Sequence, residues 1–144
     1  MYSGRRLRIK DRALIEAARN VLRRGFHGKR CSVAAAVRSK SGHVYLGRDV
    51  EGTILSCRGA ELIAISVALN AGECIKDLES MVAVAREQGR YPVLSHCGTC
   101  REILWDWTPR VEVLVRFPSG RVARLTKKRA SRALLWRLRM TEFG

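Results

Sequence analysis

Two cysteines three residues apart form the clearest chemical pattern in the sequence. Cys97 and Cys100 stand in the run Cys-Gly-Thr-Cys, where a helix is expected to begin. Free backbone N–H groups at a helix start favour thiolate over thiol, and two thiolates at this spacing can share one tetrahedral metal ion. A redox dithiol and a chance pair are the alternatives. A thioredoxin-like redox unit would place the motif near the N-terminus, whereas this one lies about two thirds along the chain, so we favour a metal-binding pair.

Glu61 is the second candidate for chemistry. It precedes a run that is apolar on nearly all sides, from Leu62 to Leu69. A carboxylate at the mouth of such a helix costs free energy unless something uses it. The helix dipole alone can explain a glutamate in a first turn, and that explanation is common. Beside a metal, Glu61 would be a general acid and base. We expect Glu61 and the cysteine pair to converge, because they start two helices of one sheet.

The length and composition fit a single domain over residues 1–144 with a real core, since 47% of the residues are apolar. The sequence has no long apolar stretch, so we expect no membrane span. The first ten residues are charged and lack the apolar region of a secretory signal, which predicts a cytoplasmic protein. The five cysteines are an odd number, and they favour thiols or metal ligands over a disulfide framework.

The net charge of +15 is concentrated at the two ends. Residues 1–30 and 110–144 each carry a net +8, whereas residues 31–109 carry −1. Solvated helix faces explain most single runs of charge, but two such ends are strongly self-repelling without a polyanion. Of the 28 basic residues 22 are arginine, the side chain that suits phosphate best. We therefore expect an RNA partner. The expected phosphate-contacting surface is the last helix, with Lys127, Lys128, Arg129 and Arg132.

Hydrophobic periodicity predicts one α/β domain with a central sheet. The expected helices cover residues 11–24, 62–69, 100–107 and a segment that begins at Thr126. Leu104 and Trp107 are expected to point inward, and the second helix is expected to pack on both faces. The expected strands cover residues 32–38, 43–46, 81–85, 111–117 and 121–125, with turns at 39–42 and 118–120 and a loop from Gly47 to Ser56.

These motifs resemble the zinc-dependent cytidine deaminase superfamily, closest to its small cytidine deaminase and blasticidin-S deaminase branch. The resemblance covers nearly the whole chain, including Ala60-Glu61 with its apolar helix and Cys97-Gly98-Thr99-Cys100-Arg101-Glu102. It implies a three-layer α-β-α cytidine-deaminase-like fold with a central mixed sheet. It also implies one zinc ion per chain, hydroxide attack on C4 of cytosine with loss of ammonia, and assembly as a dimer or tetramer.

The resemblance assigns roles to individual residues. Glu61 would shuttle protons, and Cys97 and Cys100 would bind zinc. The family's ribose-contacting Asn-x-Glu falls at Asp49-Val50-Glu51, where Asp49 replaces the asparagine. These two acidic residues are therefore the candidates for substrate binding.

The chain departs from the family at the first zinc ligand. The family has a cysteine or histidine two residues before the glutamate, and here that position is Gly59, which cannot bind metal. Cys57 lies two residues earlier and would reach the metal if Arg58 and Gly59 form a small bulge. His96, which replaces the family's proline before Cys97, is the second candidate. The third possibility is that only the two cysteines bind.

Three functions remain open at this point. The first is zinc-dependent hydrolytic deamination of cytosine in a nucleoside, nucleotide or RNA. The second is an inactive deaminase-fold protein that binds RNA of a ribosome or a tRNA. The third is a small-molecule deaminase of the blasticidin type. The first is favoured narrowly, because loss of catalysis would not be expected to spare Glu61 together with both cysteines.

Overall fold

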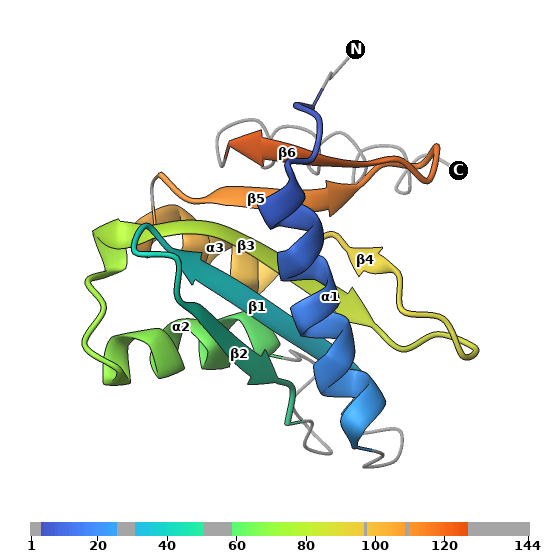
Figure 1. Cartoon of the computed structure of the whole chain (residues 1–144), viewed down its shortest axis with the longest axis horizontal. Coiled ribbons are helices and arrows are strands. Elements are labelled where there is room, and N and C mark those ends of the chain that lie inside the picture. Colours follow the sequence, from blue (N-terminus) through green and yellow to red (C-terminus); the bar gives the residue numbers. More distant parts are fainter. Residues whose placement is uncertain (1–3, 26–30, 51–58, 97, 109, 127–144) are drawn as a thin grey trace.

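A computed structural model describes residues 4–25, 31–50, 59–96, 98–108 and 110–126. Three α-helices and six strands lie in these ranges (Figure 1). In chain order they are α1 (Ile9–Arg24), β1 (Val33–Ser39), β2 (Val44–Arg48), α2 (Ala60–Asn70), β3 (Leu78–Ala85), β4 (Val93–Leu94), α3 (Gly98–Trp107), β5 (Glu112–Arg116) and β6 (Val122–Thr126), with a 3-10 turn at Ile75–Asp77.

The strands form one mixed sheet in the order β2-β1-β3-β5-β6, with β4 paired to the end of β3. The β1–β2, β1–β3, β3–β4 and β5–β6 pairs are antiparallel, and β3 and β5 are parallel. The parallel pair needs a crossover, and the segment that contains β4 and α3 supplies it. The predicted α/β fold with a central mixed sheet is confirmed.

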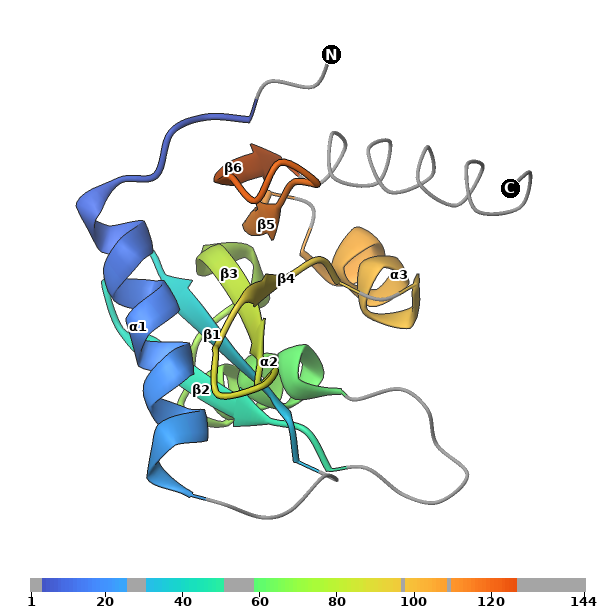
Figure 2. The same cartoon turned by 90° about the vertical axis from the view of Figure 1, so that its right-hand side faces the viewer.

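Helices cover both faces of the sheet (Figure 2). Leu14, Ala18 and Leu22 of α1 pack against the face that carries Ala34 and Val82. The other face packs against the α2 alanines and Leu104 of α3. Because neighbouring strand residues point to opposite faces, a strand covered on both sides is buried throughout. All seven residues of β1 are buried for this reason.

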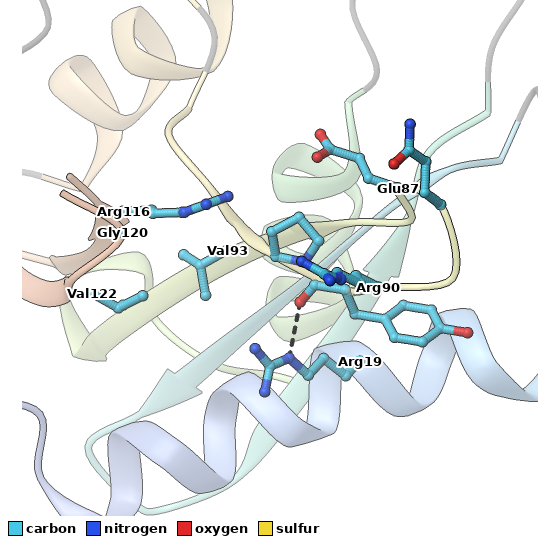
Figure 3. A pocket seen from close by; sticks show the side chains of 10 residues that line it. Arg19, Glu87, Arg90, Val93, Arg116, Gly120 and Val122 are labelled. Atoms are coloured by element: carbon cyan, nitrogen blue, oxygen red, sulfur yellow. Dashed lines mark hydrogen bonds between the residues drawn. The ribbon is translucent and has the colours of Figure 1, made fainter. Parts of the chain in front are cut away.

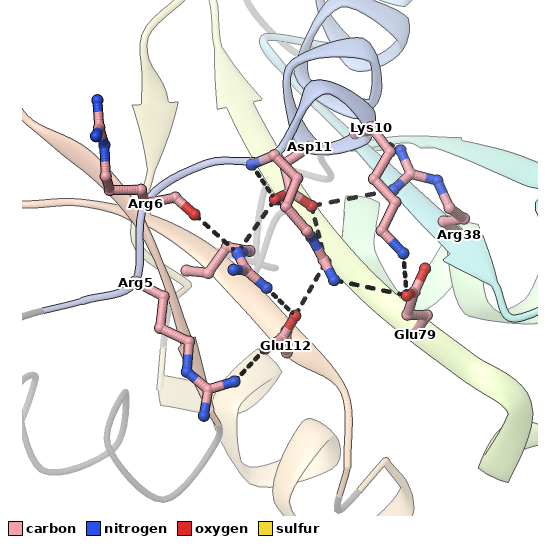
Figure 4. Close-up of polar contacts among 9 residues, drawn as sticks. Arg5, Arg6, Lys10, Asp11, Arg38, Glu79 and Glu112 are labelled. Atoms are coloured by element: carbon pink, nitrogen blue, oxygen red, sulfur yellow. Dashed lines mark hydrogen bonds and ion pairs between the residues drawn. The ribbon is translucent and has the colours of Figure 1, made fainter.

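A buried carboxylate fixes the start of α1 (Figure 4). Asp11 is fully buried and accepts hydrogen bonds from the backbone N–H of Arg8 at 2.7 Å and from its Nε at 3.0 Å. Nε of Arg124 on β6 lies 3.2 Å from the same carboxylate. Glu112 on β5 pairs with Arg8 at 3.0 Å and with Arg124 at 2.9 Å. This network ties the N-terminal segment to the β5–β6 edge of the sheet.

The structure differs from the prediction in several places: β4 (Val93–Leu94) was not expected as a strand, and β3 begins at Leu78, three residues earlier than expected. β2 continues through Arg48, where a loop was expected from Gly47 onward. The predicted burial of Trp107 is wrong: the side chain is 61% exposed, because α3 ends there with the ring beyond the packed surface. The predicted packing of α2 on both faces is also wrong, because Val67 and Leu69 are exposed.

The predicted last helix from Thr126 lies outside the described residues. No helix within the described ranges is long and apolar enough to cross a membrane. The assignment of all 144 residues to one domain stays a prediction.

Candidate active site

Glu61 lies in the first turn of α2, and its side chain is buried at 5% exposure. Gly59 is the N-cap of this helix, with φ 60° and ψ 6°. This left-handed conformation strains most residues with a Cβ atom, so it favours glycine. The backbone therefore turns at Gly59, one of the two residues that would have to form a bulge for Cys57 to reach the metal. Cys57, the ligand expected across that bulge, lies outside the described residues.

A close approach between β2 and α2 fixes the position of Glu61. A Cβ atom on Gly47 would lie 2.2 Å from the backbone oxygen of Ala60 and 2.4 Å from the backbone nitrogen of Ala64. Both atoms belong to the backbone, so a side-chain rotation could not relieve the contact. The first turn of α2 thus rests directly on β2, because Gly47 has no side chain and the helix turns an alanine toward it.

His96, just before α3, and Cys100, in its first turn, lie beside Glu61. His96 follows β4 and is 4% exposed, and Cys100 in the first turn of α3 is 1% exposed. Nδ1 of His96 lies 2.8 Å from Oε1 of Glu61. The Cys100 thiol lies 3.5 Å from Oε2 of the same carboxylate. Glu61 and Cys100 therefore lie together, as predicted, and His96 is the third residue of this buried cluster.

The surroundings of Glu61 act on its pKa in opposite directions. Burial raises the pKa of the carboxyl group, because desolvation penalises its charge. The hydrogen bond and the electrostatic attraction of His96 lower it, and a backbone N–H and the Cys100 thiol add to this effect. The lowering contributions outweigh burial, so the pKa of Glu61 lies below its ordinary value. Glu61 is thus a buried carboxylate that is ionised at neutral pH and can accept a proton.

Two side chains of the cluster are of the kind that binds zinc. Cys100 supplies a sulfur, and Nε2 of His96 is buried without a hydrogen-bond partner among the described residues. Thiolate sulfur and imidazole nitrogen are the usual zinc donors. A histidine that donates its other ring nitrogen to a carboxylate is the usual arrangement of a zinc-bound imidazole. The donors present therefore fit zinc in their chemistry.

Zinc would need further ligands from outside this cluster. Although Glu61, His96 and Cys100 are in contact, no group of three His, Cys, Asp or Glu side chains in the described part of the chain is arranged so that it could hold a metal ion. Cys97 and Cys57, which the sequence predicted as ligands, both lie outside the described residues. The full ligand set stays a prediction for that reason.

Asp49 is the described member of the pair that was predicted to bind substrate. Asp49 is fully buried just after β2. Its carboxylate accepts hydrogen bonds from the backbone N–H groups of Val33 at 3.0 Å and Ser32 at 3.3 Å. This contact joins the start of β1 to the end of β2, which is a structural role. Glu51 lies outside the described residues, as do the predicted phosphate contacts Lys127, Lys128, Arg129 and Arg132.

His96 is the residue whose importance the sequence understated. The sequence placed it second to Cys57 as a metal ligand, because adjacent side chains such as those of residues 96 and 97 usually point apart. Its contact with Glu61 was not predicted. The sequence could have indicated this contact, because the family's proline is replaced here by a residue that can donate and accept hydrogen bonds.

Known proteins resemble this chain in sequence and in fold. The chain is 31% identical to the blasticidin-S deaminase of Bacillus cereus over 130 residues, which cover 81% of this chain and 86% of that protein. The crystal structure of cytidine deaminase from Burkholderia pseudomallei matches with a TM-score of 0.65 and 26% identity, over 83% of this chain and 94% of that one. Cytidine deaminase from Bacillus anthracis shares the fold, with a TM-score of 0.66 and 20% identity over 94% and 97% of the two chains.

No protein-family model matches the chain. The relative at 31% identity spans most of both proteins, and the solved structures have the same arrangement of helices and strands. This chain belongs to the cytidine deaminase superfamily.

Proposed function

We propose that the protein is a zinc-dependent hydrolytic deaminase that acts on a cytosine ring. The observation that carries the proposal is the buried Glu61 carboxylate, which lies 2.8 Å from His96 Nδ1 and 3.5 Å from the Cys100 sulfur. A buried carboxylate held between a histidine and a thiol at the starts of two helices is suited to proton transfer beside a metal.

The reaction adds water to C4 of the ring and breaks the bond between C4 and the amino nitrogen. Glu61 carries one proton of the attacking water to N3 of the ring and then carries the proton of the new C4 hydroxyl to the amino group, so that ammonia leaves and C4 becomes a carbonyl. His96 is a positioning residue: its hydrogen bond to Oε1 fixes the orientation of the carboxylate. Burial of Glu61, His96 and Cys100 excludes bulk water and strengthens these interactions.

Cys97 and Cys100 would hold the zinc ion, together with Cys57 or His96. A bound zinc ion lowers the pKa of water and so provides a nucleophile at neutral pH. Cys100 is buried at the start of α3 with its sulfur toward Glu61, and Nε2 of His96 has no other partner among the described residues. These two observations support the assignment.

A small-molecule deaminase of the blasticidin type is the second candidate. The 31% identity to the Bacillus cereus blasticidin-S deaminase favours it. Both candidate functions would use the same buried cluster, because the cluster would act on the cytosine ring and not on the rest of the substrate.

Ammonia release from cytidine and from blasticidin S tests both candidates. We expect the zinc-loaded protein to release ammonia from at least one of them, and Glu61→Gln to lower kcat by 10²-fold or more, in the range known for general acid–base groups. The matched control is Glu102→Gln, which makes the same change at an exposed position of α3. Failure of the zinc-loaded protein to release ammonia from cytidine, from blasticidin S and from a single-stranded oligonucleotide that contains cytosine would overturn the proposed function.

A further inference from the structure

A basic hollow of about 670 Å³ lies on the α1 side of the sheet, away from the α2 side (Figure 3). Its walls come from α1, from the turn before β4 and from the β5–β6 hairpin. The residues that matter here are Arg19, Arg90, Tyr91, Val93, Arg116 and Val122. We call it the arginine groove. The described active-site cluster does not use it.

The arginine groove has guanidinium groups on separate walls. Arg19 has an internal role, because its Nε donates to the backbone oxygen of Tyr91 at 3.0 Å and its Nη1 pairs with Glu16 at 2.7 Å. Arg90 and Arg116 are exposed and have no ion-pair partner among the described residues. The acidic lining residue is Glu87. The arginine groove therefore carries two guanidinium groups that are available to an anion.

An aromatic surface lies beside these charges. Tyr91 is half-buried in the wall of the groove, and the guanidinium of Arg23 lies 5.3 Å from the centre of its ring. Positive charge next to aromatic faces is the combination that binds single-stranded nucleic acid, because phosphates pair with arginine and bases stack on rings.

The arginine groove is close to the active site along the chain. Val93 in its wall precedes His96 by three residues, which span at most about 11 Å even when fully extended. In addition, Oγ of Ser95 lies 3.5 Å from the backbone oxygen of Arg116. The segment that carries His96 to Glu61 thus also forms part of the groove.

We propose that the arginine groove binds the phosphodiester backbone of a single-stranded polynucleotide, with Arg90 and Arg116 as the phosphate contacts. A cytosine of this strand would be the substrate of the Glu61 site, so this part rests on the proposed function. Arginine suits phosphate because its planar fork makes two hydrogen bonds to one group. The net charge of +15 attracts the same class of ligand over a longer range.

Binding of a labelled single-stranded oligonucleotide with one cytosine tests the groove directly by fluorescence anisotropy. We expect the double variant Arg90→Gln and Arg116→Gln to bind at least tenfold more weakly than the wild type. The slope of log K against log salt should become shallower by about 1.4, since each contact to a single strand contributes about 0.7. The matched control is the double variant Lys76→Gln and Arg110→Gln, which removes two exposed charges elsewhere. It should bind within threefold of the wild type.

Two binding results would overturn the groove proposal: equal weakening by both double variants, or no weakening by the first. Competition by inorganic phosphate at the same concentration of phosphate groups would also overturn it, because that result identifies an isolated phosphate site. Equally tight binding of poly-glutamate would indicate a general anion surface and exclude a nucleic-acid groove.

Deamination assays test the groove proposal and the proposed function separately. Wild-type turnover of free cytidine reports on the proposed function alone, since the nucleoside carries no phosphate. Cytidine turnover without binding that depends on Arg90 and Arg116 would overturn only the groove proposal. Such binding without deamination of cytidine or of the oligonucleotide would support the groove and overturn the proposed function.

Discussion

His96 and Glu61 are 35 positions apart in the sequence, and Nδ1 of one lies 2.8 Å from Oε1 of the other. Both side chains are buried, at 4% and 5% exposure. A buried carboxylate without a partner is costly, so this hydrogen bond both stabilises Glu61 and fixes its orientation. The pair therefore joins the two helix starts from which the site is built.

The first prediction concerns this pair. His96→Ala should lower kcat by about 10- to 100-fold, the range for a residue that orients a catalytic group. KM should change little, because the lost contact is to Glu61 and not to the substrate. His43→Ala is the control, since His43 is exposed on the β1–β2 hairpin. In a double-mutant cycle with Glu61→Gln, the two effects should be far from additive, and full additivity would show that His96 does not act through Glu61.

The second prediction concerns the metal. We expect about one zinc per chain by elemental analysis, lost in Cys100→Ala and kept in Cys74→Ala, whose cysteine is exposed and free. Cys57→Ala and His96→Ala then identify the third ligand, because only the variant that removes a true ligand should weaken zinc binding strongly. Retention of full zinc by Cys100→Ala would exclude the proposed site, whatever the activity of the protein.

The third prediction concerns acid stability. Burial raises the pKa of Asp11, but the hydrogen bonds and charges of Arg8, together with Arg124, bring it below its ordinary value. The folded state therefore binds this proton less tightly than the unfolded state does. The stabilisation is complete above the unfolded pKa of about 3.9, and it is lost as the pH falls through the lower folded pKa.

Asp11→Asn should cost about 1–3 kcal/mol at pH 7, because it replaces a fully buried carboxylate by a neutral amide that cannot satisfy the hydrogen bonds of the partly exposed Arg8 and Arg124. The difference from the wild type should shrink below about pH 4, where the wild-type carboxyl group also becomes protonated. Urea unfolding at several pH values measures both effects. Asp106→Asn, on the exposed side of α3, should show neither. A pH-independent difference for Asp11→Asn would contradict the linkage.

The fold was largely predictable because its signals are local. Apolar spacing located α1, and the turn residues at 39–42 located the β1–β2 hairpin. The contact between Glu61 and His96 was not predictable, because it depends on how α2 and the segment after β4 pack together in three dimensions. The internal role of Asp49 was missed for the same reason: its partners are backbone N–H groups of β1, which no side-chain pattern reveals.

The fourth prediction concerns α3, where helical spacing correctly predicted the burial of Leu104 and wrongly predicted the burial of Trp107. Leu104 is 3% exposed and Trp107 is 61% exposed, although the pattern placed both inward. Leu104→Ala should cost about 2–5 kcal/mol of unfolding free energy, as expected for a buried leucine. Trp107→Ala should change it by no more than about 0.5 kcal/mol. Equal costs in urea unfolding would show that Trp107 is buried in solution.

The fifth prediction concerns Gly47, which lies under the first turn of α2. Gly47→Ala would place a Cβ atom 2.2 Å from the backbone oxygen of Ala60, so the helix must move away from β2. Overpacking of this kind costs about 1–3 kcal/mol. The residue after Ala60 is Glu61, so the same movement shifts the carboxylate, and a displacement of about 1 Å can lower kcat by about 10²-fold.

Gly42→Ala separates the two effects of that substitution. Gly42 has φ +94° and open space around its Cβ position, so an alanine there is strained by about 1–2 kcal/mol without pressing on a neighbour. It should lower stability to a similar degree and leave kcat unchanged, because the hairpin turn does not contact the site. If Gly47→Ala likewise lost stability but kept full kcat, the position of Glu61 would not depend on the contact between β2 and α2.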